Sequence, residues 1–146
     1  MIHFLDSSAV VKLYSDEDDH DMVRGLAGPH LVSELARVEV PGALWRKSRM
    51  GELDEADVVV LTSAFAADWH RPAGEEHFMI VRSTPALLDE AARLTGIHGL
   101  RAYDAVQLAA ALAARRAVPE CSSFTAYDPA LNRAAATLSF AIRDPA

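Results

Sequence analysis

Four acidic residues in separate parts of the chain are the strongest candidates for chemistry. Asp6 directly follows the apolar run Ile2–Leu5, and Asp128 follows a later apolar run. Asp104 falls in the first turn of an expected helix, and Glu39 lies about one turn inside another. Several carboxylates in one cleft raise one another's pKa unless a cation neutralises them. If the fold gathers these four, the site suits Mg²⁺ or Mn²⁺, hard ions that bind carboxylate and water oxygens.

A divalent ion at such a site favours phosphodiester hydrolysis, because it can hold a phosphate oxygen, generate a hydroxide and stabilise the leaving oxygen. Each acid also has a purely structural interpretation. Asp6 and Asp128 are well placed as helix N-caps, and Asp104 can simply favour a helix N-terminus. Glu39 shares a helical face with apolar neighbours, where a solvated carboxylate is less natural. Taken together, the acids favour a nuclease.

Strands and helices that alternate along the chain must position these acids. The expected strands are Ile2–Leu5, His30–Ser33, 77–82, 122–126 and 138–142. Seven helices are expected between and after these strands. The first two follow Asp6, as far as Tyr14, and the acidic run 16–21. The others run from a cap at Ser33 to Gly51, over 53–69, from Ser83 to Gly96, over Ala102–Ala117, and onward from Pro129. Pro41 predicts a kink near 37–41 or a later start of the third helix.

This alternation predicts one domain over residues 1–146. It indicates a three-layer α/β/α fold with a central parallel sheet of about five strands. In such sheets ligands bind at the carboxyl ends of the strands, beside the point where the strand order reverses. We therefore expect Asp6, Asp104 and Asp128 at one end of the sheet, with Glu39 pointing back over it.

Composition and charge exclude several classes of protein. A single cysteine, Cys121, allows no internal disulfide and offers no structural zinc site. No apolar stretch is long enough for a membrane span and no basic leader precedes one, so we expect a soluble, cytoplasmic protein with no membrane partner. The net charge of −7 argues against binding nucleic acid through an overall basic surface. Local patches must do any such binding.

The compact basic cluster is Arg46, Lys47 and Arg49 beside Trp45. It could contact RNA phosphates and stack a base. A basic C-terminal turn is also favoured by the helix dipole, and we prefer that interpretation here. The cluster is therefore not among the predicted site residues.

Four motifs in order resemble the PIN-domain proteins, particularly VapC-like toxins. They are Phe4-Leu5-Asp6-Ser7-Ser8 with the helix that follows, Val38-Glu39-Val40, Leu100-Arg101-Ala102-Tyr103-Asp104 and Phe124-Thr125-Ala126-Tyr127-Asp128. The resemblance spans nearly the whole chain. It implies a PIN-like fold, Mg²⁺- or Mn²⁺-dependent endoribonuclease activity, a cognate small antitoxin and a homodimer. It makes Asp6, Glu39 and Asp104 the core metal-site acids, with Asp128 as a more variable fourth.

Details of these motifs qualify that resemblance. Gln107 stands where the family often has His, and Pro41 lies two residues after Glu39. Thr125 is expected to support Asp128 through a hydroxyl hydrogen bond. Ser7 is interpreted as a helix cap or as a group that supports the acids.

Other functions stay open from the sequence. They are a housekeeping RNA-processing nuclease and a PIN-like scaffold that binds without cutting. A phospho-acceptor domain would want adjacent acids after the first strand and a late Lys, which the chain lacks. Val23, Leu26 and Leu61 could form a groove for the antitoxin or could equally belong to the core.

Overall fold

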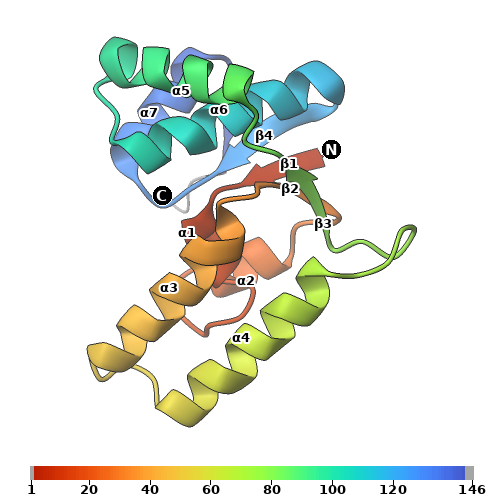
Figure 1. Cartoon of the computed structure of the whole chain (residues 1–146), viewed down its shortest axis with the longest axis vertical. Coiled ribbons are helices and arrows are strands. Elements are labelled where there is room, and N and C mark those ends of the chain that lie inside the picture. The colour runs from red at the N-terminus through yellow and green to blue at the C-terminus, as the bar shows by residue number, and fades with distance from the viewer. Residues whose placement is uncertain (1, 144–146) are drawn as a thin grey trace.

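The strands form a single parallel sheet, which confirms the predicted three-layer, PIN-like fold. The computed structural model describes residues 2–143 (Figure 1). Its strands are β1 (Ile2–Leu5), β2 (His30–Ser33), β3 (Phe78–Val81), β4 (Cys121–Thr125) and β5 (Ala141–Ile142). Their order in the sheet is β3-β2-β1-β4-β5, and every pairing is parallel.

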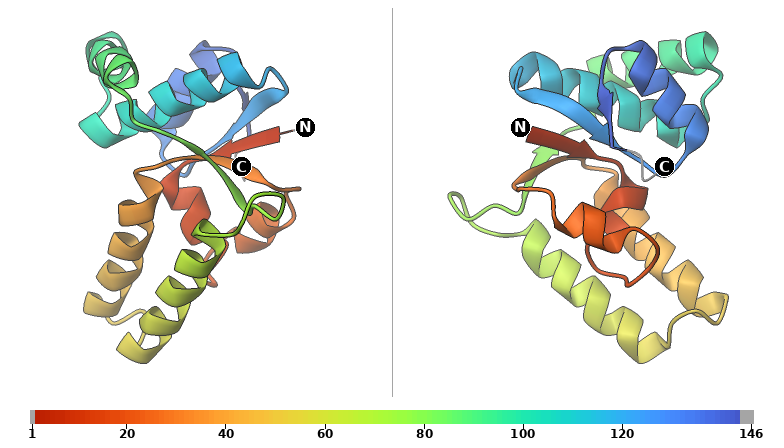
Figure 2. Two further views of the ribbon diagram at one scale, coloured as in Figure 1. Left: turned by 45° about the vertical axis from the view of Figure 1, so that its right-hand side comes forward. Right: turned by 180° about the vertical axis from the view of Figure 1, so that it is seen from behind.

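Helices cover both faces of the sheet (Figure 2). One layer holds α1 (Ser7–Val11), α2 (His20–Arg24), α3 (Ala36–Arg49) and α4 (Glu55–Trp69). The other holds α5 (Pro85–His98), α6 (Ala102–Ala117) and α7 (Pro129–Thr137). None of the helices within residues 2–143 is both long and apolar enough to cross a membrane.

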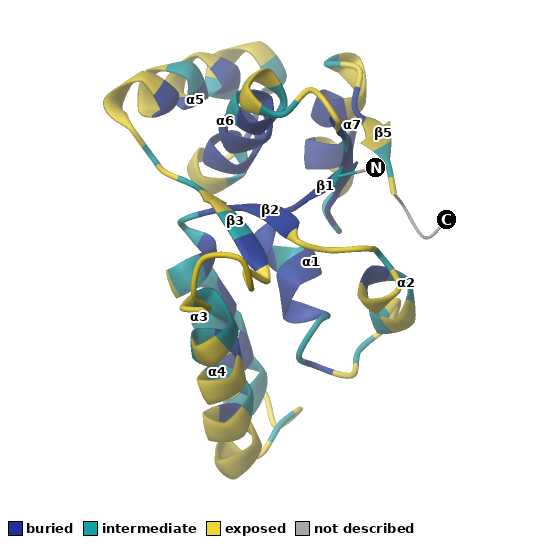
Figure 3. Cartoon of the chain, turned by 90° about the vertical axis from the view of Figure 1, so that its right-hand side faces the viewer, coloured by how far each residue is buried: buried dark blue, intermediate teal, exposed yellow. Residues whose placement is uncertain are grey.

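Strand β1 is buried on both sides, which explains why its successive residues Phe4 and Leu5 are both apolar. Successive side chains of a strand point to opposite faces. Phe4 therefore packs into the core under α5, α6 and α7, where its ring stacks on Phe124 at 5.7 Å. Leu5 packs into the other core with Val10 and Phe65. Figure 3 shows the buried α1 behind the sheet, whereas the outer surfaces of α4 and α5 are exposed.

The predicted antitoxin groove residues belong to this second core. Val23 is fully buried, and Leu26 and Leu61 pack against the same cluster. Their apolar character is therefore explained by packing within the chain. Val23 is therefore not available to a groove, whereas Leu26 and Leu61 are partly exposed and a groove for the antitoxin at these two positions stays a prediction.

Several element ends differ from the predictions. Helix α1 stops at Val11, short of Tyr14, and β5 covers only Ala141–Ile142. Gly96 lies inside α5, and the helix ends at Gly99, whose φ of 64° is the left-handed conformation that glycine adopts most easily. Hydrogen bonds and backbone conformation, which residue type only partly indicates, set these ends.

Helix α3 contains Pro41 within a continuous helix. It begins at Ala36, two residues later than a cap at Ser33 would place it. Ala36, Val40 and Leu44 are buried on its inner face. Tertiary packing of this face outweighs the backbone hydrogen bond that the proline removes.

Strand order reverses at β1, between β2 and β4. Connections therefore leave the sheet in opposite directions at this point, and a crevice opens at the carboxyl ends of the strands. Asp6 follows β1 directly, and the amide of Asp6 donates to the carbonyl of Thr125 at 3.0 Å. This bond holds the ends of β1 and β4 together at the crevice.

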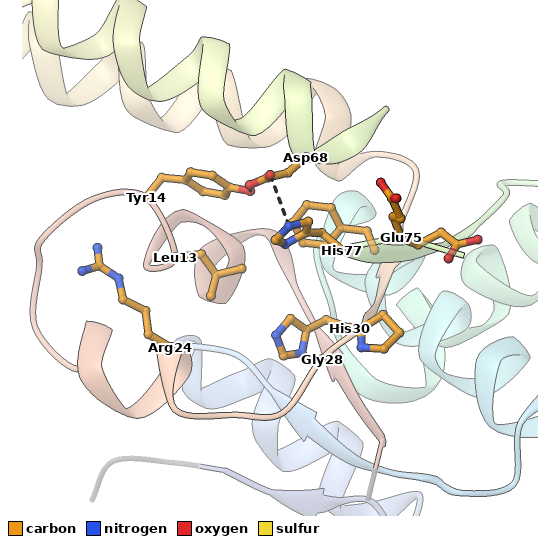
Figure 4. Close-up of a pocket in the computed structure, with 11 residues that line it drawn as sticks. Leu13, Tyr14, Arg24, Gly28, His30, Asp68, Glu75 and His77 are labelled. Atoms are coloured by element: carbon orange, nitrogen blue, oxygen red, sulfur yellow. Dashed lines mark hydrogen bonds and ion pairs between the residues drawn. The ribbon is translucent and has the colours of Figure 1, made fainter. Parts of the chain in front are cut away.

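Histidines gather at the opposite, amino end of the sheet. The register pairs Phe4 with Leu31, so His3 lies beside His30 on the adjacent strand. His30 and His77 line a cavity of about 510 Å³ (Figure 4). The pKa of His30 is lowered to about 4, chiefly by burial and also by the nearby His3 and His77.

We expect acid to destabilise the protein through His30. The folded pKa of about 4 lies below the ordinary value of 6.5, so the unfolded chain binds more protons between these pH values. Stability therefore falls as pH drops from 6.5 to 4, by about 2 kcal/mol from this group. Urea unfolding at a series of pH values measures the loss. His30→Gln, which cannot take up the proton, should flatten the slope, and an unchanged slope would contradict the assignment.

Candidate active site

All four predicted acids line one pocket of about 600 Å³ at the carboxyl end of β1. Asp6 comes from the start of α1, Glu39 from α3, Asp104 from the first turn of α6 and Asp128 from the start of α7. The gathering expected from their positions in the sequence is thus present in the structure. Their role in metal binding and catalysis remains a prediction.

Asp6 is buried, with 5% of its surface exposed. Its Oδ1 accepts hydrogen bonds from the amide of Ala9 at 2.9 Å and the hydroxyl of Ser8 at 2.6 Å, so it caps α1 as expected. The pKa of Asp6 is raised to about 7, chiefly by burial and also by the nearby charges of Asp104 and Glu39, although the hydrogen bonds from Ser8 and Ala9 oppose the rise. At neutral pH the carboxyl group is therefore poised between its two forms, and a cation in the pocket would favour the ionised one.

Glu39 is held in the pocket by two side chains. Its Oε1 accepts from the hydroxyl of Ser7 at 2.8 Å and from Nε2 of Gln107 at 2.8 Å. The same Nε2 donates to the Ser7 hydroxyl at 2.9 Å, which closes a triangle. Pro41 therefore does not remove Glu39 from the pocket, and the supporting role of Ser7 is confirmed.

Gln107 contacts the site but is not among the predicted site residues, because its position in the sequence indicates only a departure from the family pattern. It lies three residues after Asp104, so both side chains share a face of α6. That spacing could have indicated a side chain directed into the same pocket.

Asp104 and Asp128 share Arg101 as a partner. Nε of Arg101 lies 3.3 Å from Oδ2 of Asp104, and its Nη2 lies 3.3 Å from Oδ2 of Asp128. Oδ1 of Asp128 accepts from the amide of Leu131 at 2.9 Å, so Asp128 is also an N-cap. One residue thus serves both the helix and the pocket.

Thr125 does not support Asp128 as predicted. Its side chain is fully buried as the last residue of β4, and its hydroxyl has no hydrogen-bond partner among the described residues. Asp128 lies beyond a short turn at the start of α7, where the helix amide and Arg101 satisfy it. The expected hydrogen bond is therefore wrong.

The four carboxylates are the type of ligand that a hard divalent ion binds, but their side chains are not arranged around an ion in this structure. Within residues 2–143, no three His, Cys, Asp or Glu side chains are arranged to hold a metal ion. Arg101 supplies the positive charge between Asp104 and Asp128 instead. Its side chain is 82% exposed, and ion pairs that open to water are weak. Release of Arg101 would leave an all-carboxylate site suited to Mg²⁺ or Mn²⁺.

The structure divides the basic cluster at the end of α3. Arg46 and Arg49 line the pocket together with the acids. Lys47 instead forms ion pairs with Glu17 and Glu52. Tyr103, with 66% of its surface exposed, also lines the pocket. An interpretation through the helix dipole alone therefore misses the pocket position of Arg46 and Arg49, and Tyr103 is not among the predicted site residues.

Solved structures share this fold. VapC20 from Mycobacterium tuberculosis, described as a sarcin-ricin loop cleaving toxin, superposes with a TM-score of 0.64 at 16% identity, over 95% of this chain and 96% of its own. PAE2754 from Pyrobaculum aerophilum superposes with a TM-score of 0.59 at 22% identity, over 92% of this chain and 79% of its own. The resemblance to VapC-like proteins indicated by the motifs is confirmed at the level of the fold.

Comparisons of sequence alone give no further relatives. No protein-family profile matches the chain, and no curated protein matches it in sequence. The likeness that these comparisons show therefore lies in the backbone arrangement.

Proposed function

We propose that this protein is an Mg²⁺- or Mn²⁺-dependent endoribonuclease that acts as the toxin of a toxin-antitoxin pair. The observation that carries the proposal is the convergence of Asp6, Glu39, Asp104 and Asp128 on one pocket at the switch point of the sheet. The shared fold with VapC20, described as a sarcin-ricin loop cleaving toxin, supports the choice of RNA as substrate.

Different residues of the chain would have different roles in such a site. A bound divalent ion would supply Lewis acidity and an activated water for phosphodiester hydrolysis. Asp6 and Asp104 would be its principal ligands. Glu39 would complete the core set, and Ser7 and Gln107 fix its carboxylate in place.

Asp128 and Arg101 would bind groups at the edge of the site. Asp128 would bind a second ion or orient the attacking water. Arg101, when released from Asp104 and Asp128, carries a guanidinium with the geometry to bind phosphate oxygens. Ser8 links Asp6 to the segment that follows β4, since the Ser8 hydroxyl donates to Asp6 and accepts from the amide of Tyr127 at 3.1 Å.

The proposed partners are RNA, a small antitoxin that covers the acidic pocket, and a second copy of the chain in a homodimer. The antitoxin and the homodimer rest on the motif resemblance. We propose a cytoplasmic location for the pair, where its RNA substrate is found.

Metal dependence is the first test of this function. We expect the purified protein to cleave RNA in Mg²⁺ or Mn²⁺ and to stop when EDTA removes the ion. Gel analysis of labelled RNAs, including ribosomal RNA hairpins, measures cleavage across a metal titration. RNA that stays intact at every metal concentration would contradict the proposal.

A scaffold that binds without cutting is the second candidate. The pairing of Arg101 with both Asp104 and Asp128 favours it, because this arrangement neutralises two acids without a metal. The same titration separates the two functions: a scaffold binds RNA and leaves it whole. Growth arrest on expression, relieved in an inactive variant, would distinguish a toxin from a housekeeping nuclease.

A further inference from the structure

We propose that one face of α3 is a track for the phosphates of single-stranded RNA, with Arg46 and Arg49 as positioning residues. This inference rests on the proposed function and names how its substrate is held. The track is defined as Glu39, Gly42, Ala43, Arg46 and Arg49, the five residues of α3 that line the acidic pocket.

Helical spacing places these residues in one line. Positions three, four, seven and ten residues apart share a face of an α-helix. With a rise of about 1.5 Å per residue, Arg46 lies about 10 Å and Arg49 about 15 Å beyond Glu39 along the helix axis. Figure 1 shows α3 leading from the sheet towards the tip of the α3–α4 hairpin. A strand cut at the acids would therefore continue along this face.

Gly42 keeps the track open between the acids and the arginines. A Cβ atom built at Gly42 meets no other atom within 4 Å, so the space above this turn is empty. The neighbouring Ala43 is also small. The backbone of a nucleic acid can thus approach the helix between Glu39 and Arg46.

The side chains of Arg46 and Arg49 have no partner among residues 2–143. Neither the Arg46 nor the Arg49 side chain forms an ion pair or hydrogen bond with any residue in the described range 2–143. This is unusual in a protein of net charge −7, in which Lys47, between them, pairs with two glutamates. Both guanidinium groups are exposed and line the pocket. Phosphate oxygens match their charge and geometry.

Single-stranded RNA fits this site better than a duplex. The scissile phosphate must reach acids that line a pocket, and unstacked strands and loops can enter such a space. Tyr103 stands exposed on the pocket wall contributed by α6, where its ring can stack a base. Phosphate contacts along α3 and one stacked base would position the strand with little dependence on sequence.

The test compares Arg46→Gln/Arg49→Gln with the control Arg71→Gln/Arg116→Gln. The control removes the same charge at the other end of the sheet: Arg71 has no side-chain partner among the described residues, and Arg116 makes one exposed ion pair at 3.8 Å. Binding of short fluorescein-labelled RNAs of two unrelated sequences is measured by anisotropy in EDTA over a range of salt concentrations. Because EDTA prevents metal-dependent cleavage, this readout does not depend on nuclease activity.

We expect the track variant to bind both RNAs about tenfold more weakly than the control. Its plot of log affinity against log salt should be shallower by about 1.4, the change for two phosphate contacts on a single strand. In Mn²⁺, KM for RNA should rise with little change in kcat. Gly42→Leu should weaken binding without changing the salt slope.

Contrary results would identify which idea fails. Equal affinity and salt slope in track and control variants would overturn the track, even if the protein cleaves RNA. A loss confined to one RNA sequence would overturn the assignment to phosphates, and full binding by Gly42→Leu would overturn the path along α3. Arginine-dependent binding without cleavage in any metal would uphold the track and refute the nuclease.

Discussion

Asp6→Asn and Asp104→Asn should each reduce RNA cleavage by about a thousandfold or more. Asp6 follows β1 at the switch point and is buried, while Asp104 projects from the first turn of α6 into the same pocket. An amide keeps the size of the carboxylate but removes the negative charge that a divalent ion requires. Single-turnover cleavage in Mn²⁺, with circular dichroism to verify folding, measures the loss.

Substitution of the remaining two acids should reduce RNA cleavage by smaller factors. Glu39→Gln should reduce cleavage less than the first two substitutions because Ser7 and Gln107 still orient the side chain. Asp128→Asn should reduce cleavage least because Asn retains the N-cap of α7. Asp89→Asn, at an exposed position of α5, is the matched control and should keep full activity. Full activity in folded Asp6→Asn and Asp104→Asn would refute the site.

The same Asp6→Asn change should stabilise the metal-free protein at neutral pH. The pKa of Asp6 is raised by burial from 3.8 in the unfolded chain to about 7 in the folded protein. The folded state therefore holds more protons between pH 4 and 7, and the stability contributed by this group is lost as pH rises through that window. Asn has no charge to bury and still accepts the amide of Ala9, so we expect a gain of about 4 kcal/mol at pH 7.5.

Thermal unfolding in EDTA measures this gain, which should shrink as pH falls from about 7 to below 3.8, where the carboxyl group is protonated in both the folded and the unfolded state. Adding Mn²⁺ at pH 7.5 should raise the unfolding temperature of the wild type more than that of Asp6→Asn, because binding to the folded state stabilises it. Lower stability of Asp6→Asn in EDTA at pH 7.5 would show that the buried carboxyl is not a site of unfavourable charge.

Much of this fold could be predicted because local patterns carry it. The bounds of β1, β2 and α6 agree with the predictions, since buried parallel strands are short apolar runs and alanine strongly favours helix. Asp6 and Asp128 could be located at strand ends for the same reason. The ends of α1, α5 and β5 could not, because they depend on single hydrogen bonds and on the left-handed conformation of Gly99.

The sequence by itself thus determined the parallel sheet and four acids at its carboxyl end, because hydrophobic period and strand polarity are local properties. Only the tertiary structure decided what surrounds those acids. Gln107 forms a hydrogen bond with Ser7, which lies 100 residues away in the sequence, and Arg101 forms one with Asp128, 27 residues away. Arg46 faces the pocket whereas its neighbour Lys47 faces Glu17. Adjacent residues of a helix diverge by about 100°, so their partners depend on how the helix is docked against the rest of the fold.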